Sequence, residues 1–111
     1  MKWILVWVAL AGSAQAEEWR ALTGAEIAGA LVSRVIVYQG GQRQGFMADG
    51  FTTYESRDTV NMGEWRVEGG KYCSIWPPSD LWACYGVEVK GIDVRFVGEG
   101  GEVTVGRYGD L

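Results

Sequence analysis

The chain has 111 residues, of which ten are basic, fourteen are acidic and none is histidine, so its formal net charge is −4. This length provides one domain with a modest hydrophobic core. An acidic chain is a poor partner for nucleic acid or an anionic membrane, because both are bound through basic patches. Without histidine, Ser-His and Cys-His nucleophile pairs are excluded.

The N-terminal segment, MKWILVWVALAGSAQAEEW, has the three-part layout of a secretory signal peptide. A lysine precedes an apolar run, and Ala14-Gln15-Ala16 forms a small-x-small cleavage site. A membrane anchor is the alternative, but the apolar run is shorter than the ~20 residues that a span requires. We therefore expect residues 1–16 to be a signal peptide. Residues 17–111 should then form a single β-rich domain, periplasmic or secreted, without a stable membrane anchor after cleavage.

The first predicted element after the signal peptide is a short helix in the stretch LTGAEIAGAL. Thr23 and Glu26 have the spacing of a capping box, and Leu22 and Ile27 have that of a hydrophobic staple. These signals predict a helix over residues 24–31. A helix this short depends on packing against the rest of the domain.

Eight short runs rich in β-branched and aromatic residues follow, separated by glycine-containing turns. Such runs predict antiparallel strands joined as a meander. We expect a mainly β fold, an antiparallel meander of seven or eight strands with one short N-terminal helix, able to curl into an open small barrel. The runs are RVIVY, QGFMA, GFTTY, GEWRV, KYCSIW, LWACYGVEV, IDVRFV and EVTVG.

The stretch KYCSIWPPSDLWACY predicts a hairpin closed by a disulfide. If residues 77–80 form the loop, Cys73 lies directly opposite Cys84. Opposed Cα atoms in an antiparallel pair are about 4.5–5.5 Å apart, which a disulfide accepts. An exported protein meets an oxidising environment, so we expect the bond to form. Closing this loop should stabilise the fold by roughly 3 kcal/mol.

Two more turns extend this register over four strands. Gly69-Gly70 and Lys90-Gly91 each fit a two-residue turn, the second of which places Val89 opposite Ile92. One face then collects apolar residues: Trp65, Val67, Tyr72, Trp76, Leu81, Ala83, Tyr85, Val87, Val89, Ile92, Val94 and Phe96. The other face is polar and carries the disulfide as a surface-side staple: Glu64, Arg66, Glu68, Lys71, Glu88, Asp93 and Arg95, with Ile75 and Trp82 among them.

The polar residues give little reason to expect a metal or a cofactor. Two cysteines without histidine make an incomplete zinc site, and their spacing is not that of a C-x-x-C pair. Glu88 opposite Asp93 invites a calcium or acid–base site. A solvated charge ladder with Lys71 and Arg95 is the interpretation we favour. We therefore expect no metal, no cofactor and no catalytic residue.

Ile75 and Trp82 form a candidate binding patch with Pro77 and Pro78. The predicted register puts both apolar side chains on the polar face, beside the disulfide and a loop stiffened by two prolines. An exposed tryptophan beside an isoleucine is typical of a partner-binding surface. The alternative is that another segment folds over this face and makes it a second core layer.

The motifs LTGAEI, ADG, GEWRVEGGKYCSIW and ACYGVEVKG together resemble a family of small secreted alphaproteobacterial proteins. The shared pattern is a G-x-W-x-V-x-G-x-x-x-C strand followed by a second cysteine. The positions that match it are Gly63, Trp65, Val67, Gly69, Cys73 and Cys84, and the long tryptophan-proline loop departs from it. The resemblance implies an exported, disulfide-bonded β-meander and supplies no catalytic residues.

Taken together, these features predict a non-enzymatic protein. We expect an exported binding or inhibitor-like module of the cell envelope, with an envelope protein as its partner. The alternative is a small β-barrel that holds an apolar ligand between helix and sheet, in a cavity of ~300 Å³ or more. A carboxylate-based hydrolase would need two acidic groups meeting in a cleft.

Overall fold

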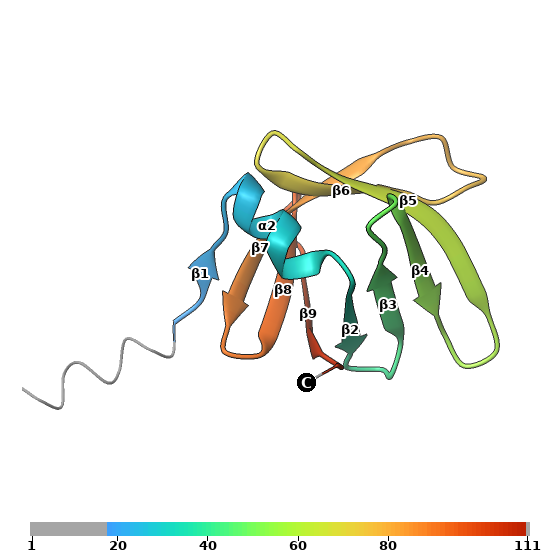
Figure 1. Cartoon of the computed structure of the whole chain (residues 1–111), viewed down its shortest axis with the longest axis horizontal. Helices are drawn as coiled ribbons and strands as arrows, with labels where there is room; N and C mark the ends of the chain where they lie inside the picture. Colours follow the sequence, from blue (N-terminus) through green and yellow to red (C-terminus); the bar gives the residue numbers. More distant parts are fainter. Residues whose placement is uncertain (1–17, 111) are drawn as a thin grey trace, which may run out of the picture.

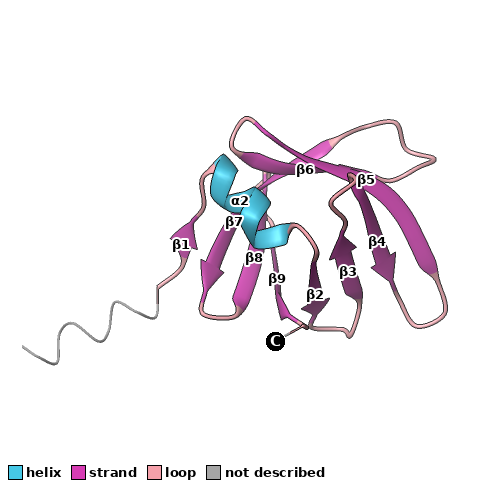
Figure 2. Cartoon of the chain, viewed as in Figure 1, coloured by secondary structure: helices cyan, strands magenta, loops and turns pink. Residues whose placement is uncertain are grey.

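A computed structural model describes residues 18–110, so the predicted signal peptide lies outside the described part of the chain. These residues form one helix and nine strands (Figures 1 and 2). No helical segment among them has the length and hydrophobicity of a membrane span. The elements are β1 (Arg20–Ala21), α2 (Gly24–Leu31), β2 (Arg34–Tyr38), β3 (Arg43–Phe46), β4 (Phe51–Glu55), β5 (Val60–Glu68), β6 (Lys71–Ile75), β7 (Ala83–Lys90), β8 (Asp93–Gly98) and β9 (Val103–Tyr108).

The helix α2 begins and ends at the predicted residues. The backbone N–H of Thr23 donates to the Glu26 carboxylate at 2.9 Å, which is one bond of the expected capping box. This bond lowers the pKa of the Glu26 carboxyl. Ile27 and Leu31, one turn apart, are completely buried. The helix is therefore fixed by its N-terminal cap and by one apolar face.

The strands β2–β9 form a closed barrel in which each strand pairs antiparallel with the next. The last strand, β9, returns to pair with β2, with Ile36 opposite Tyr108. The predicted antiparallel meander is thus confirmed, and the pairing of β9 with β2 closes it completely into a barrel. The short strand β1, which sequence analysis missed, adds to β7 through Arg20 opposite Val89.

The helix closes one end of the barrel. Gly24 lies against Gly70 in the β5–β6 turn, and the Tyr108 hydroxyl at the end of β9 donates to the Ala30 carbonyl at 2.9 Å. The loops at the other end, 39–42, 56–59, 76–82 and 99–102, leave the mouth of the barrel without a helix. In Figure 1 the loop between β6 and β7 extends away from α2.

Buried and more exposed side chains alternate along the strands, which distinguishes the interior of the barrel from its outer surface. The pattern is clearest in β8, where Val94 and Phe96 are buried and their neighbours are more exposed. The predicted apolar face is therefore the interior of the barrel, and the predicted polar face is its outer surface. The buried hydrophobic cluster comprises Ile27, Leu31, Ile36, Phe46, Tyr72, Val87, Val94 and Phe96.

Two of the three predicted hairpin registers are confirmed. Glu68 lies opposite Lys71 across the Gly69-Gly70 turn. Tyr72 lies opposite Tyr85, as the disulfide hairpin required. Among the predicted apolar positions near this hairpin, Leu81 is 76% exposed in the loop before β7, and Ala83 is exposed as well. The pairing of β6 with β7 stops before reaching Leu81, so the expected inward position of Leu81 is wrong.

The predicted β7–β8 register is wrong by two residues. Lys90 lies opposite Asp93, so the turn is Gly91-Ile92 rather than Lys90-Gly91. A two-residue hairpin turn needs a positive φ at its first central residue, and Gly91 provides it with a φ of 61°. Ile92 consequently lies in the turn and is exposed.

This shift also changes the charge pairing on the outer surface. Glu88 lies opposite Arg95 instead of Asp93, and the Arg95 Nε–Glu88 Oε1 distance is 2.6 Å. Asp93 pairs with Arg107 of β9, with 3.4 Å between their charged atoms. The two carboxylates expected to face each other are therefore each matched with an arginine.

Candidate functional site

A cavity of about 240 Å³ opens at the mouth of the barrel, opposite α2. Its walls and floor come from seven strands and from the start of the β6–β7 loop. Six of its lining residues are aromatic and three are polar, and we call the whole set the aromatic cup. The set comprises Tyr38, Tyr54, Tyr72, Trp76, Tyr85, Phe96, Gln44, Ser74 and Thr104.

A buried hydrogen-bond network forms the floor of the aromatic cup. The Tyr38 hydroxyl donates to Gln44 Oε1 at 2.6 Å, and Gln44 Nε2 donates to the Tyr72 hydroxyl at 2.9 Å. Gln44 Nε2 also donates to Thr52 Oγ1 at 3.1 Å. Thr52 in turn donates to the Gly45 carbonyl at 2.6 Å. Because every member has a partner, the network holds the two tyrosines in one arrangement.

The tyrosines of the floor stay neutral well beyond ordinary pH. Burial raises the pKa of the Tyr38 hydroxyl, and the neighbouring tyrosines Tyr72, Tyr54 and Tyr85 add to this shift. Burial likewise raises the pKa of Tyr72. These hydroxyls can therefore act as hydrogen-bonding groups rather than as bases.

The walls of the aromatic cup are rings packed against one another. Tyr38 stacks on Tyr54 with ring centroids 6.0 Å apart, and Tyr72 stacks on Tyr85 at 5.9 Å. Trp76 meets the Tyr54 ring edge-on at 6.2 Å. Stacked and edge-to-face pairs of this kind hold the rings in fixed orientations.

Gly63 of β5 allows Trp76 to lie over the mouth. A Cβ at residue 63 would stand 2.8 Å from the indole ring of Trp76 and in contact with the Ile75 carbonyl. The indole N–H of Trp76 donates to Ser74 Oγ at 3.2 Å. Trp76 is thus positioned by a glycine in β5 and by the Ser74 hydroxyl near the end of β6.

The predicted patch has a different environment from the aromatic cup. Ile75 and Trp82 are half-buried, whereas Pro77 and Pro78 are exposed. The Arg66 guanidinium lies over the Trp82 ring, 3.9 Å from its centroid. Trp82 is therefore partly covered by the Arg66 side chain and partly open to solvent.

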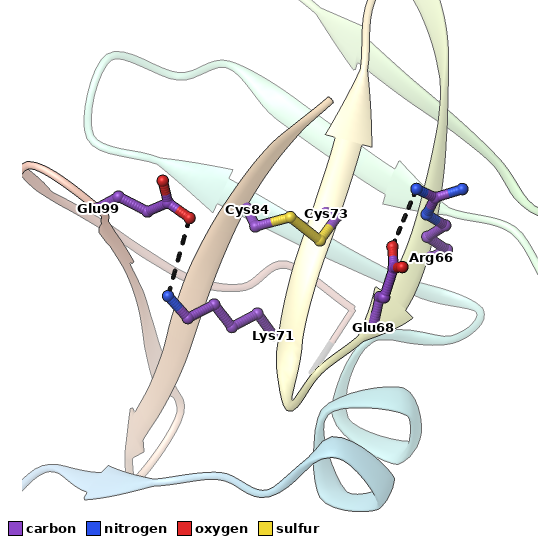
Figure 3. The surroundings of a disulfide bond; sticks show 6 residues. All are labelled: Arg66, Glu68, Lys71, Cys73, Cys84 and Glu99. Carbon is purple, nitrogen blue, oxygen red and sulfur yellow. Dashed lines mark ion pairs between the residues drawn. A yellow bond between two sulfur atoms is a disulfide. The ribbon is translucent and has the colours of Figure 1, made fainter. Parts of the chain in front are cut away.

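The predicted disulfide between Cys73 and Cys84 is present and joins β6 to β7 (Figure 3). Its description as a surface-side staple is wrong for Cys73, whose side chain is completely buried. Arg66 lies opposite Cys73 in the β5–β6 pair, and its guanidinium reaches across to Trp82 on the far side of β6. Arg66 therefore lies beside the disulfide on the outer face of the barrel.

A second hollow, of about 420 Å³, lies on the outer surface over β2, β8 and β9. Val37, Val105 and the Asp93–Arg107 ion pair line it. Its two charged groups are paired with each other, Val105 is exposed and Val37 is half-buried. The hollow is larger than the aromatic cup, but it offers no buried polar group that would orient a ligand.

Nothing among residues 18–110 groups three or more acidic or cysteine side chains in a way that could hold a metal ion. The nine residues of the aromatic cup include neither a carboxylate nor an amine. The chemistry that the cup can offer is therefore that of aromatic faces, hydroxyls and one amide.

Sequence analysis missed the aromatic cup as a site because it assigned the inward-facing rings to the core. Tyr72, Trp76, Tyr85 and Phe96 were expected on the apolar face, and they do point into the barrel. The available signal was chemical: tyrosines recur at inward positions near the same end of several strands, where a dry core would carry aliphatic residues. The alternative prediction placed a ligand between helix and sheet, whereas the aromatic cup lies at the other end from the completely buried Ile27 and Leu31.

Comparison of the chain with protein-family models, with curated proteins and with solved structures found no match. The resemblance to secreted alphaproteobacterial proteins therefore stays a prediction.

Proposed function

We propose that the protein is an exported, non-catalytic binding protein that holds a small molecule in the aromatic cup. The observation that carries this proposal is the cavity itself, which opens at the barrel mouth and is lined by rings and satisfied polar groups. Eight-stranded barrels have an interior of the size that either fills with side chains or holds one small ligand. Here the helix end is filled and the mouth is hollow.

The size and rigidity of the aromatic cup support a small ligand. Its volume of about 240 Å³ is below the ~300 Å³ at which sites for drug-sized molecules begin. The Tyr38–Gln44–Tyr72 network fixes the floor before any ligand arrives. Preorganised groups of this kind lower the entropy cost of binding. We infer a ligand with one compact group that fits within the ring of aromatic side chains.

The lining supports binding rather than catalysis. A hydrolase based on carboxylates would need two acidic groups in the cavity, and the aromatic cup has none among its lining residues. Its tyrosines have a raised pKa and hold their protons. A bound molecule would therefore meet hydrogen-bonding groups and aromatic faces.

The Cys73–Cys84 disulfide is consistent with an oxidising, exported location. A periplasmic or secreted site of action belongs to this proposal. In that compartment a small carrier protein would meet ligands that diffuse through the cell envelope.

Two neighbouring residues of β9 provide a matched test. Thr104 lines the aromatic cup and Val105 faces the outside. A library of small ring-bearing and amine-bearing compounds would be screened by amide and indole NMR shifts. We expect compounds that bind to shift the NMR signals of the Gln44 amide and the Trp76 indole. Thr104→Phe should abolish these shifts, because the larger side chain fills the cavity. Val105→Phe should leave them intact. Hits that shift only residues outside the cup, or none at all, would contradict the proposal.

A second candidate is the envelope-protein partner expected from the predicted patch. The observation in its favour is a cluster of exposed residues in one loop, Pro77, Pro78 and Leu81, beside half-buried Trp82. Exposed apolar residues on a stiff loop suit an interface.

Equilibrium unfolding of Trp82→Ala separates this patch from a core layer. Loss of the half-buried ring and its contact with Arg66 should lower the free energy of unfolding by about 1–2 kcal/mol. A loss of about 3–5 kcal/mol is typical of a core aromatic and would remove the patch as a candidate.

A further inference from the structure

Three aromatic rings outside the aromatic cup have one of the chain's own cations over them. Arg66 lies over Trp82, and Arg34 lies over Tyr108 with its guanidinium carbon 3.8 Å from the ring centroid. Trp19 is covered in the same way by basic residues of β7 and β8. Within residues 18–110 no ring of the cup has such a cation over it. The electron-rich surface that the cup rings present to the cavity therefore has no lysine or arginine of the described chain competing for it.

A carboxylate stands at the rim of the aromatic cup. Glu102, in the β8–β9 loop, folds its side chain over Gly98, so that Glu102 Oε1 lies 2.9 Å from where a Cβ of residue 98 would be. Gly98 pairs with Tyr85, and the next inward row contains Phe96 opposite Thr104. All three of these neighbours line the cavity. The carboxylate is therefore held beside the opening by a glycine that leaves room for it.

The loops around the mouth carry an excess of negative charge. The four loops 39–42, 56–59, 76–82 and 99–102 contain one basic residue, Arg57. They contain four acidic residues, Asp58, Asp80, Glu99 and Glu102, of which Glu99 is paired with Lys71 on the outer surface. A cleft rimmed by one sign of charge concentrates ligands of the opposite sign. The mouth therefore favours cations and disfavours anions.

We propose that the ligand of the aromatic cup is a small organic cation, of the quaternary or methylated ammonium class. The inference rests on the proposed binding function and names its ligand class. A ring of tyrosine and tryptophan faces without a competing lysine or arginine is the arrangement that binds alkylammonium groups through cation–π attraction. Glu102 supplies the countercharge at the rim, and the hydroxyls of Ser74 and Tyr72 can meet a hydroxyl group on the ligand.

Choline and its uncharged analogue dimethylbutanol provide the test, because a tert-butyl group replaces the trimethylammonium group without changing its shape. Both would be titrated into the purified, disulfide-bonded protein and followed through the NMR signals of the Gln44 amide and the Trp76 indole. We expect choline to bind at least about tenfold more tightly. Its affinity should fall as salt is added, whereas that of dimethylbutanol should not.

Two pairs of variants test the assigned groups. Glu102→Gln should weaken choline several-fold without affecting dimethylbutanol. Glu99→Gln is the matched control, since the Glu99 carboxylate points to Lys71 on the outer surface at 3.9 Å (Figure 3), and it should change the choline affinity much less. Tyr54→Leu removes a ring face and should weaken choline more than Tyr54→Phe, which keeps the ring.

The outcomes separate this inference from the proposed function. If the two compounds bind equally, or if only uncharged compounds shift the cup signals, the cation inference is overturned and small-molecule binding in the aromatic cup stands. If the compound library produces no shift in the cup either, both fail. A preference for choline that Tyr54→Leu and Glu102→Gln leave intact would also overturn the assignment to this cavity.

Discussion

At the scale of single residues, the aromatic cup depends on two glycines whose lack of a side chain leaves room for a neighbouring group. Gly63 leaves room for the Trp76 indole, and Gly98 leaves room for the Glu102 carboxylate. Neither glycine has a positive φ, so the requirement is for space and not for backbone freedom. Two glycines on different strands therefore decide where one ring and one charge of the mouth lie.

The first prediction concerns Gly63→Ala. The added methyl group would overlap the Trp76 ring and the Ile75 carbonyl, so we expect the free energy of unfolding to fall by about 1–3 kcal/mol. The fluorescence of Trp76 should change at the same time. Urea unfolding monitored by circular dichroism measures the first effect.

Gly86→Ala is the control for this prediction. A Cβ at Gly86 would meet only the Val97 carbonyl at 3.9 Å, and its stability should change by no more than about 0.5 kcal/mol. Equal losses in the two variants would mean that the effect comes from replacing a strand glycine in general rather than from displacing Trp76.

At the scale of elements, turn chemistry explains which hairpins sequence analysis could predict. Gly69-Gly70 allows a two-residue turn with positive φ at both positions, and both have it. Lys90-Gly91 contains a single glycine, so two placements of the turn compete. The structure uses the one in which Gly91 comes first. Opposite charges indicated the same choice, because it sets Arg95 rather than Asp93 against Glu88.

The wrong β7–β8 register still assigned most side chains to the correct face. Strand side chains alternate with a period of two, so an error of two residues returns every residue to its side of the sheet. Only residues beside the turn, such as Ile92, were misplaced. Hydrophobic patterning therefore predicted the barrel interior, whereas it could not predict closure, which depends on β2 meeting β9 far along the chain.

The candidate site was less predictable than the fold, for a physical reason. Hydrophobicity does not distinguish an aromatic residue that fills a core from one that lines a cavity. Tyr72 does both, since it is buried among apolar residues and also faces the cup. Whether such a ring borders a hollow depends on how the whole barrel packs, which no local pattern in the sequence encodes.

The second prediction concerns the β6–β7 hairpin, which carries Trp76 at one end of its loop. Replacing Cys73 and Cys84 together with serine should lower the free energy of unfolding by about 2–4 kcal/mol, because the unfolded chain regains freedom. Circular dichroism should still show the strand content of the parent. The NMR signals of the aromatic cup should broaden, since the loop loses its anchor. A melting temperature equal to that of the parent would contradict this account.

At the scale of the whole molecule, the barrel has two ends with different roles. Ile27 and Leu31 of α2 enter one end and complete the hydrophobic cluster. The other end holds the polar floor formed by Gln44 and its tyrosine partners. The helix therefore completes the core at one end, and the other end presents aromatic and polar side chains to the cavity.

The third prediction follows from the buried tyrosines. Burial raises the pKa of Tyr38, Tyr72 and Tyr108 in the folded protein. In the unfolded chain a tyrosine ionises near a pKa of about 10. The neutral form is favoured by folding, so the contribution is fully present below about pH 10 and is lost as the pH rises toward the folded pKa values. Denaturant unfolding at increasing alkaline pH should show stability falling.

Ultraviolet absorbance of tyrosinate provides the direct measurement. Of the five tyrosines, these three should remain protonated in the folded protein at a pH where the unfolded chain has largely ionised. Tyr38→Phe should reduce the alkaline loss of stability. A folded protein in which all five tyrosines titrate together at the ordinary pKa would show that the floor of the aromatic cup is open to water.

The seam between β2 and β9 sets the order of events when the chain folds. Its residues are far apart in sequence, with Val37 opposite Arg107 and Arg34 bonded to Asp110 through two contacts of 2.9 and 3.1 Å. Contacts of such high contact order form late and slow the folding rate. Until β9 arrives, β2 and β8 are unpaired edges that can recruit another chain. A chain that stops before Val103 should therefore aggregate rather than form a smaller barrel, and the complete chain should refold best when dilute.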